Sequence, residues 1–158
     1  MNDFVITCPP QSVLPVADSD KKFPVRHIWC VGRNYADHAR EMGHDPDREL
    51  PFFFSKPADA IVSSNSVLTF PSMTSDLHYE VELVVAIGVR GKEIHSESAL
   101  EHVWGYGVGI DMTRRDLQAQ AKKLQRPWEM GKGFDQSAPV SALHSVSEVG
   151  HPLEGRIW

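Results

Sequence analysis

Residues 77–88, LHYEVELVVAIG, limit the possible folds of this chain more than any other stretch. Apolar residues recur at every second position, which predicts a β-strand whose side chains alternate between two faces. One predicted face carries Tyr79, Val81, Leu83, Val85 and Ile87. The other carries two glutamates, Glu80 and Glu82, followed by Val84 and Ala86. A strand with two carboxylates on one face needs a physical explanation.

The spacing of the two glutamates suggests one. Two strand rises separate their Cα atoms by about 6.6 Å, so the carboxylates can converge on one point. A solvent-facing strand edge with two ordinary glutamates is the alternative. Val84 and Ala86 favour a partly buried face, where neighbouring carboxylates repel each other and lose hydration. A divalent cation such as Mg²⁺, Mn²⁺ or Ca²⁺ would relieve both costs.

A third carboxylate, Asp111, ends the glycine-rich stretch VWGYGVGID (103–111), which also predicts a strand. Asp111 could cap the helix predicted at 112–125 or close the turn before it. Thr113 and Asp116 have the spacing of a capping box, and that arrangement would free Asp111 for another role.

The remaining pattern indicates one mainly β domain with short helices. Residues 1–24 are predicted to form an N-terminal arm, and residues 25–158 a single domain of sufficient length for a core. Further strands are predicted at 25–32, 51–57 and within 60–71, and a short helix at 34–43.

Composition excludes several classes of protein. The 158 residues carry a formal net charge of −5, which argues against a nucleic-acid partner. No apolar run approaches the ~18 residues that a membrane span needs, and the N-terminus lacks a signal-peptide pattern. We therefore expect a cytoplasmic protein with two free thiols, Cys8 and Cys30.

Four motifs together resemble the fumarylacetoacetate hydrolase family, in the order that the family has them. They are VGRNYADHAREM, which is similar to the acylpyruvate hydrolase branch, then HYEVELVVAIG, GYGVGIDMTRRDLQ and PWEMGKGFD. The resemblance implies a mixed, mainly β roll with short helices. It also implies that Glu80, Glu82 and Asp111 bind one divalent metal, Mg²⁺ or Mn²⁺.

His38 and Glu41 are three residues apart on one face of the helix predicted at 34–43. From the residues alone, an ordinary surface pair is the simpler reading. A carboxylate beside an imidazole also raises its basicity, as a water-activating base requires. The resemblance implies such a catalytic dyad, in a segment similar to a lid.

Other candidates depend more strongly on the resemblance. Lys132, between two glycines, would be only a loop cation by itself, but the matching lysine of the family approaches the substrate and stabilises an enolate. Arg115 and Gln118 match a stretch near the site and are equally suited to an exposed helix. Lys56, in FFFSKP, is a further candidate for contact with a substrate carboxylate.

The chemistry expected from these parts is hydrolysis of a carbon–carbon bond in an acylpyruvate such as fumarylpyruvate, by a homodimer. Decarboxylation of oxaloacetate, or isomerisation of an oxo diacid, would use the same parts. The sequence stops at HPLEGRIW, before the further strands and the Thr-Gly-Thr-Pro loop of the family, so we expect the roll to be incomplete. An inactive, truncated metal-binding fragment is therefore a second hypothesis.

Overall fold

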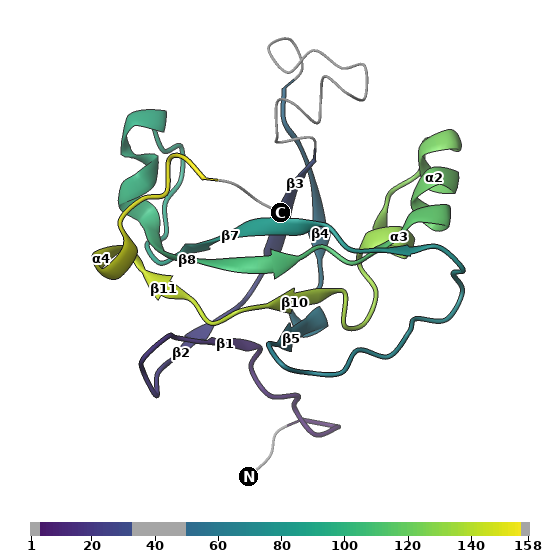
Figure 1. Cartoon of the computed structure of the whole chain (residues 1–158), viewed down its shortest axis with the longest axis horizontal. Coiled ribbons are helices and arrows are strands. Elements are labelled where there is room, and N and C mark those ends of the chain that lie inside the picture. Colours follow the sequence, from purple (N-terminus) through teal and green to yellow (C-terminus); the bar gives the residue numbers. More distant parts are fainter. Residues whose placement is uncertain (1–3, 33–49, 156–158) are drawn as a thin grey trace.

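The computed structural model describes residues 4–32 and 50–155 (Figure 1). The helix predicted at 34–43, with His38 and Glu41, lies outside these residues. The described part is mainly β with short helices, as predicted. No helix within 4–32 or 50–155 has the length and apolar character that crossing a membrane requires.

The central sheet has five strands in the order β11-β8-β10-β5, with β7 paired to β8 beside this path. Its strands are β5 (Ile61–Ser63), β7 (Val81–Ile87), β8 (Val103–Ile110), β10 (Ala138–Val140) and β11 (His144–Ser145). β5 and β10 run parallel, and the other pairs are antiparallel. The glycines of β8 allow the close approach predicted for them, since a Cβ atom at Gly105 would overlap the carbonyl of His144.

The strand predicted at 77–88 is in fact two strands with different partners. β6 (Leu77–His78) pairs with β9 (Thr113–Arg114), and β7 pairs with β8, so Tyr79 and Glu80 lie between the two strands. The period-two pattern alone could not reveal this change of partner. The two faces are as predicted: Leu83 and Val85 are about half exposed, whereas Glu82 is partly buried and Ala86 is buried.

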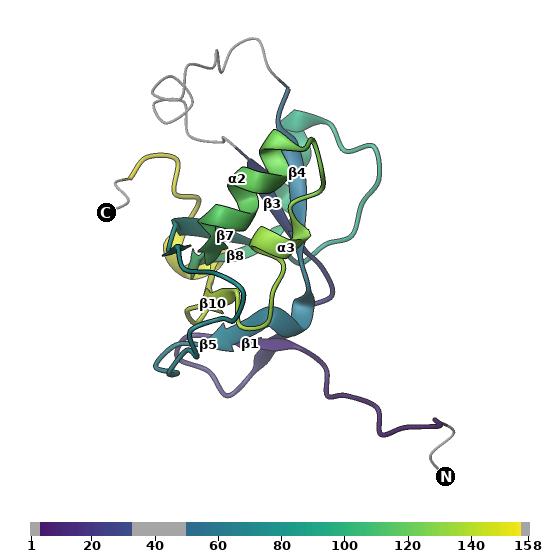
Figure 2. The same ribbon diagram turned by 90° about the vertical axis from the view of Figure 1, so that its right-hand side faces the viewer.

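A two-stranded ribbon stands against the central sheet. It consists of β3 (Ile28–Gly32) and β4 (Phe52–Lys56), which are antiparallel with Cys30 opposite Phe54. These strands correspond to the predictions at 25–32 and 51–57. The 3₁₀ turn η1 (Ala58–Ala60) links β4 to β5 below it (Figure 2), and Lys56 at the end of β4 is buried.

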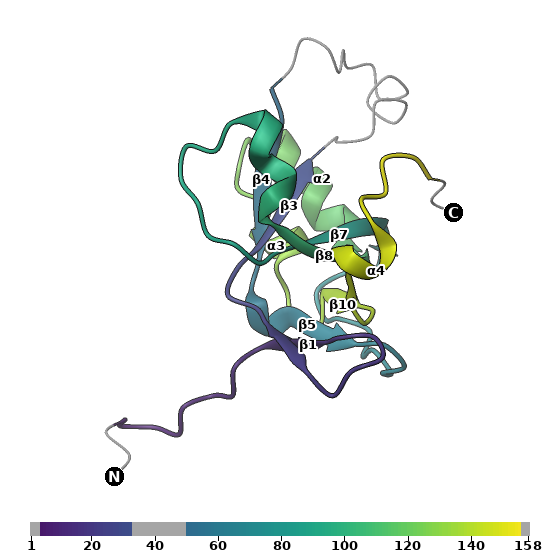
Figure 3. The same cartoon turned by 90° about the vertical axis from the view of Figure 1, so that its left-hand side faces the viewer.

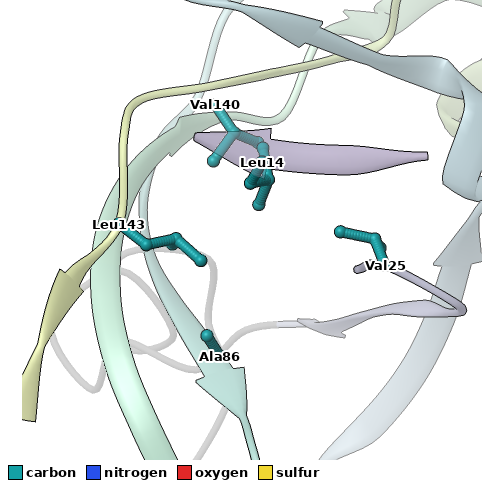
Figure 4. Close-up of a cluster of buried hydrophobic side chains, with 5 residues drawn as sticks. All are labelled: Leu14, Val25, Ala86, Val140 and Leu143. Carbon is teal, nitrogen blue, oxygen red and sulfur yellow. The ribbon is translucent and has the colours of Figure 1, made fainter. Parts of the chain in front are cut away.

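The N-terminal residues do not simply lie over the core as an arm, because part of this segment is buried in the core. β1 (Val13–Pro15) and β2 (Lys22–Pro24) form an antiparallel hairpin, and Leu14 is buried. Figure 4 shows the side chains that converge there: Leu14, Val25, Ala86, Val140 and Leu143. Residues 4–11 are exposed and extend away from the body (Figure 3).

The remaining helices are short. They are the 3₁₀ helix η2 (Ser96–His102) and the α-helices α2 (Arg115–Lys123), α3 (Glu129–Lys132) and α4 (Val146–Val149). Figure 1 places α2 and α3 beside one end of β7 and β8, with α4 at the other end.

The capping box predicted for α2 is wrong. Thr113 belongs to β9, and the helix begins at Arg115. Asp116 instead accepts hydrogen bonds from the Thr74 hydroxyl at 2.6 Å and the Ser75 amide at 3.1 Å. The pairing of β9 with β6 holds Thr113 in extended backbone, which delays the start of the helix.

Candidate active site and metal centre

Backbone pairing brings Glu80 and Asp111 together. Val81 pairs with Ile110 across β7 and β8, and one step further the Asp111 amide donates a 2.7 Å hydrogen bond to the Glu80 carbonyl. The side chains of both residues therefore leave the sheet at the same end, next to α2 and α3.

Lys132 lies between these two carboxylates. Its side chain is only 2% exposed. The ammonium donates to Glu80 Oε2 at 2.5 Å, to Asp111 Oδ2 at 2.6 Å and to the Thr113 hydroxyl at 2.7 Å. All three N–H groups thus have acceptors, which is what burial of an ammonium requires. The Phe54 ring lies 5.2 Å from the same nitrogen.

A close contact between α3 and α2 positions Lys132 between Glu80 and Asp111. Gly131 faces α2, and a Cβ atom at that position would lie 2.9 Å from the Gln118 amide nitrogen. The missing side chain therefore lets the two helices approach closely enough to bury the lysine.

Arg115 extends the cluster on the other side of Glu80. Its guanidinium donates to Glu80 Oε1 at 2.5 Å and to the Gln118 side-chain oxygen at 2.7 Å. Burial disfavours the ionised form of Glu80, but the hydrogen bond and charge of Lys132, and then those of Arg115, hold its pKa below the ordinary value.

Lys56 lies beyond Asp111. Its ammonium is 2.8 Å from Asp111 Oδ1 and donates to the carbonyls of Met112, at 3.1 Å, and Lys132. Burial lowers the pKa of Lys56, and the charge of Asp111 opposes this effect.

These contacts form one chain of alternating charge, in the order Arg115, Glu80, Lys132, Asp111, Lys56. Glu82 lies on the same face as Glu80. Burial raises the pKa of Cys30 to about 11, so this thiol is a neutral part of the site wall. The negative charges of Asp111 and Glu82 also raise the pKa of the Cys30 thiol, and the positive charge of Lys56 lowers it.

The chemistry of the site fits a hard divalent cation. Within residues 4–32 and 50–155, no group of three His, Cys, Asp or Glu side chains is arranged to hold a metal ion. Two of the predicted ligands nevertheless converge on one cation, the Lys132 ammonium. Asp111 Oδ1 is buried and accepts no hydrogen bond in the described part, although Lys56 lies beside it. Carboxylate oxygens in this position suit Mg²⁺ or Mn²⁺.

The structure gathers most of the predicted site residues. Glu80, Asp111, Arg115, Gln118, Lys56 and Lys132 form one connected cluster, with Glu82 on the same strand face. His38 and Glu41 lie outside the described residues. Sequence reasoning missed two neighbours, Thr113 and Cys30. Strand alternation contains a signal for Thr113, because residues 111 and 113 of an extended backbone share a face.

The fold and the site define a known class of protein. A family model described as fumarylacetoacetate (FAA) hydrolase C-terminal matches residues 27–158. The chain therefore belongs to the fumarylacetoacetate hydrolase family.

Solved structures give more specific likenesses. The chain is 55% identical to fumarylpyruvate hydrolase from Pseudomonas aeruginosa, solved with Mn²⁺ and pyruvate, with a TM-score of 0.89 over 95% of this chain and 66% of that one. It is 57% identical to a proposed fumarylpyruvate hydrolase from Burkholderia cenocepacia, with a TM-score of 0.90 over 98% of this chain and 66% of that one.

Two curated relatives are named for reactions of oxaloacetate. The mitochondrial oxaloacetate tautomerase of Mus musculus is 41% identical over 84% of this chain and 60% of its own length. The mitochondrial oxaloacetate decarboxylase of Dictyostelium discoideum is 44% identical over 84% of this chain and 61% of its own length. The chain thus spans about three fifths of these relatives.

Proposed function

We propose that this chain carries the site of a metal-dependent hydrolase that cleaves a carbon–carbon bond in an acylpyruvate such as fumarylpyruvate. The observation that most favours this reaction is the 55% identity to a fumarylpyruvate hydrolase across 95% of the chain. That identity is higher than the 41% and 44% shared with the two oxaloacetate enzymes.

Glu80, Glu82 and Asp111 would hold the metal, as Mg²⁺ or Mn²⁺. A divalent cation there supplies Lewis acidity toward the oxygens of an oxo acid. Arg115 and Gln118, which are hydrogen-bonded to each other at the same edge, would bind a substrate carboxylate. Arg115 would then be shared between Glu80 and the substrate.

The hydrolytic step requires a base and a stabilised leaving group. His38, assisted by Glu41, would take a proton from water, whose oxygen attacks the acyl carbonyl carbon. The bond between that carbon and the neighbouring methylene then breaks, and its electron pair passes into a pyruvate enolate. The positive charge of Lys132 would stabilise the enolate, and protonation at the methylene carbon gives pyruvate beside the carboxylic acid.

The charge of the site favours a diacid substrate. Three cations, Arg115, Lys132 and Lys56, are matched in number by three carboxylates, Glu80, Glu82 and Asp111. A bound divalent metal would leave an excess of positive charge. An oxo diacid carries two negative charges and would balance it, which suits both fumarylpyruvate and oxaloacetate.

The second candidate is therefore oxaloacetate chemistry, either tautomerisation or decarboxylation. The names of the curated relatives from Mus musculus and Dictyostelium discoideum favour it. Neither reaction needs an attacking water. Decarboxylation would therefore depend less on His38, whereas tautomerisation moves a proton and would still use a base.

One experiment separates the candidates. The whole chain is incubated with fumarylpyruvate, acetylpyruvate or oxaloacetate, with and without Mn²⁺ or Mg²⁺, and pyruvate release and keto–enol exchange are recorded. Hydrolysis predicts metal-dependent pyruvate release from an acylpyruvate. Turnover of oxaloacetate alone would replace our first candidate by the second, and no turnover by a folded protein that binds Mn²⁺ would favour the inactive fragment.

A homodimer and a cytoplasmic location stay predictions from the sequence. Light scattering on the purified protein tests the first. Fractionation of source cells tests the second, and it matters because several relatives are named as mitochondrial.

A further inference from the structure

We propose that Lys56 is a positioning residue, which fixes the Asp111 carboxylate and the main chain of Lys132 and does not contact the substrate. This inference deepens the proposed function and rests on it, because it assigns to Asp111 and Lys132 the roles of metal ligand and enolate stabiliser. It also replaces the substrate contact that the sequence suggested for Lys56.

The surroundings of Lys56 support this role. The residue is 4% exposed, although it ends a strand of a two-stranded ribbon. Its ammonium donates hydrogen bonds to the Met112 carbonyl at 3.1 Å and to the Lys132 carbonyl, and it forms an ion pair with Asp111 Oδ1 at 2.8 Å. The two carbonyls use two of its three N–H donors, and the side chain is only 2% exposed, so the third donor faces Asp111 and not the solvent from which a substrate would come.

These three partners belong to the two segments that carry the proposed metal ligand and the proposed enolate stabiliser. Met112 directly follows Asp111, so Lys56 holds both the side chain and the adjacent backbone of this predicted ligand. The Lys132 carbonyl is the last of α3, and its contact sets where that short helix ends. One buried charge on β4 thereby ties the end of β8 to the end of α3.

Loss of this tie should loosen the site without removing a metal ligand. Groups that only orient a metal ligand typically change metal affinity by about 10–100-fold. If Lys56 served merely as a competing positive charge, its removal would strengthen cation binding. The sign of the change in affinity therefore separates the two roles.

The test compares Lys56→Met with Lys56→Arg and with Lys92→Met in the full chain. Lys92 is a suitable control because its side chain is 88% exposed. Calorimetric titration with Mn²⁺ alone should show binding weakened at least ~10-fold in Lys56→Met. It should be restored to within about threefold in Lys56→Arg, which keeps the charge and donors, and unchanged in Lys92→Met. Unchanged or tighter Mn²⁺ binding by folded Lys56→Met would overturn the proposal.

Turnover supplies a second criterion. A positioning role predicts a fall in kcat with KM for the oxo acid nearly constant, because the substrate never touches Lys56. A rise in KM at constant kcat would show that Lys56 binds the substrate and would overturn the proposal. If Lys56→Met does not fold, Lys56→Gln takes its place under the same criteria, since it keeps two donors without the charge.

A wild-type protein that neither binds Mn²⁺ nor turns over a substrate would contradict the proposed function, and hydrogen exchange would then test Lys56 alone. Exchange at the amides of residues 111–113 and 131–133 should accelerate in Lys56→Met, recover in Lys56→Arg and stay unchanged in Lys92→Met. If these amides exchanged at equal rates in the wild type and in Lys56→Met, the positioning role would be refuted.

Discussion

The amide of Asp111 donates a 2.7 Å hydrogen bond to the carbonyl of Glu80, so two carboxylates distant in sequence are adjacent just beyond the paired ends of β7 and β8. Lys132 bridges their side chains, at 2.5 Å from Glu80 and 2.6 Å from Asp111. We therefore expect metal binding, acid stability and the packing of α3 all to depend on this cluster, and each expectation yields a prediction.

Removal of either bridged carboxylate should abolish metal binding. Orienting groups around a metal are worth about 10–100-fold in affinity, so loss of a ligand in Glu80→Gln or Asp111→Asn should cost more than ~100-fold. Calorimetric titration with Mn²⁺ measures this, with exposed Glu97→Gln as the control. Wild-type affinity in both site variants would show that the cation binds elsewhere.

Stability should depend on Glu80 at low pH. Lys132 and Arg115 hold the Glu80 pKa below the ordinary value of 4.5 for a glutamate. The ionised carboxylate therefore contributes stability that is complete above about pH 4.5 and is lost as the pH falls through the lower, folded-state pKa. Urea unfolding at pH 3 to 7 should show a shallower acid loss in Glu80→Gln. Parallel pH profiles for variant and wild type would contradict this explanation.

Packing of α3 should tolerate no side chain at Gly131. A Cβ atom there would lie 2.9 Å from the backbone nitrogen of Gln118, so Gly131→Ala must displace one helix. We expect a loss of about 1–3 kcal/mol in the free energy of unfolding, together with weaker Mn²⁺ binding, because Lys132 moves with α3. Gly155→Ala is the matched control, since nothing lies within 4 Å of that position. Equal stability of the two variants would show that α2 and α3 can separate freely.

His38→Ala should distinguish hydrolysis from decarboxylation. A general base contributes roughly 10²–10⁴-fold in rate, so turnover of fumarylpyruvate should fall by that factor while oxaloacetate decarboxylation falls much less. Mn²⁺ affinity should stay constant because His38 is not a predicted ligand. The exposed His95→Ala serves as the control. Equal losses in both reactions would remove support for His38 as the water-activating base.

The two thiols should react at very different rates. Burial raises the pKa of Cys30 to about 11, whereas Cys8 is exposed. At pH 8 the thiolate fraction of Cys30 is then roughly 200-fold below that of an ordinary cysteine with a pKa of about 8.5. Iodoacetamide should therefore modify Cys8 first, as peptide mass mapping would show. Modification of Cys30 at the rate of Cys8 would mean that β3 opens readily.

Several features of this protein follow from local sequence alone. The period-two pattern around Glu82 predicts both the strand and the partly buried face that carries the carboxylate. The glycines of 103–111 predict close backbone approach, which Gly105 shows. The charged residues in four motifs indicate the family and the candidate site residues of this chain. Side-chain chemistry and short-range spacing can both be read from the amino-acid sequence.

Long-range contacts were decided only by the tertiary structure. The predicted strand 77–88 divides at Glu80 because its two parts pair with different partners, a fact that no local period contains. Thr113 adopts a strand because β6 pairs with it, so the capping box fails. Lys56 is buried because its acceptors at Met112 and Lys132 are 56 and 76 residues away along the chain. Local sequence sets what each side chain can do, and the pairing of distant segments sets which partners it meets.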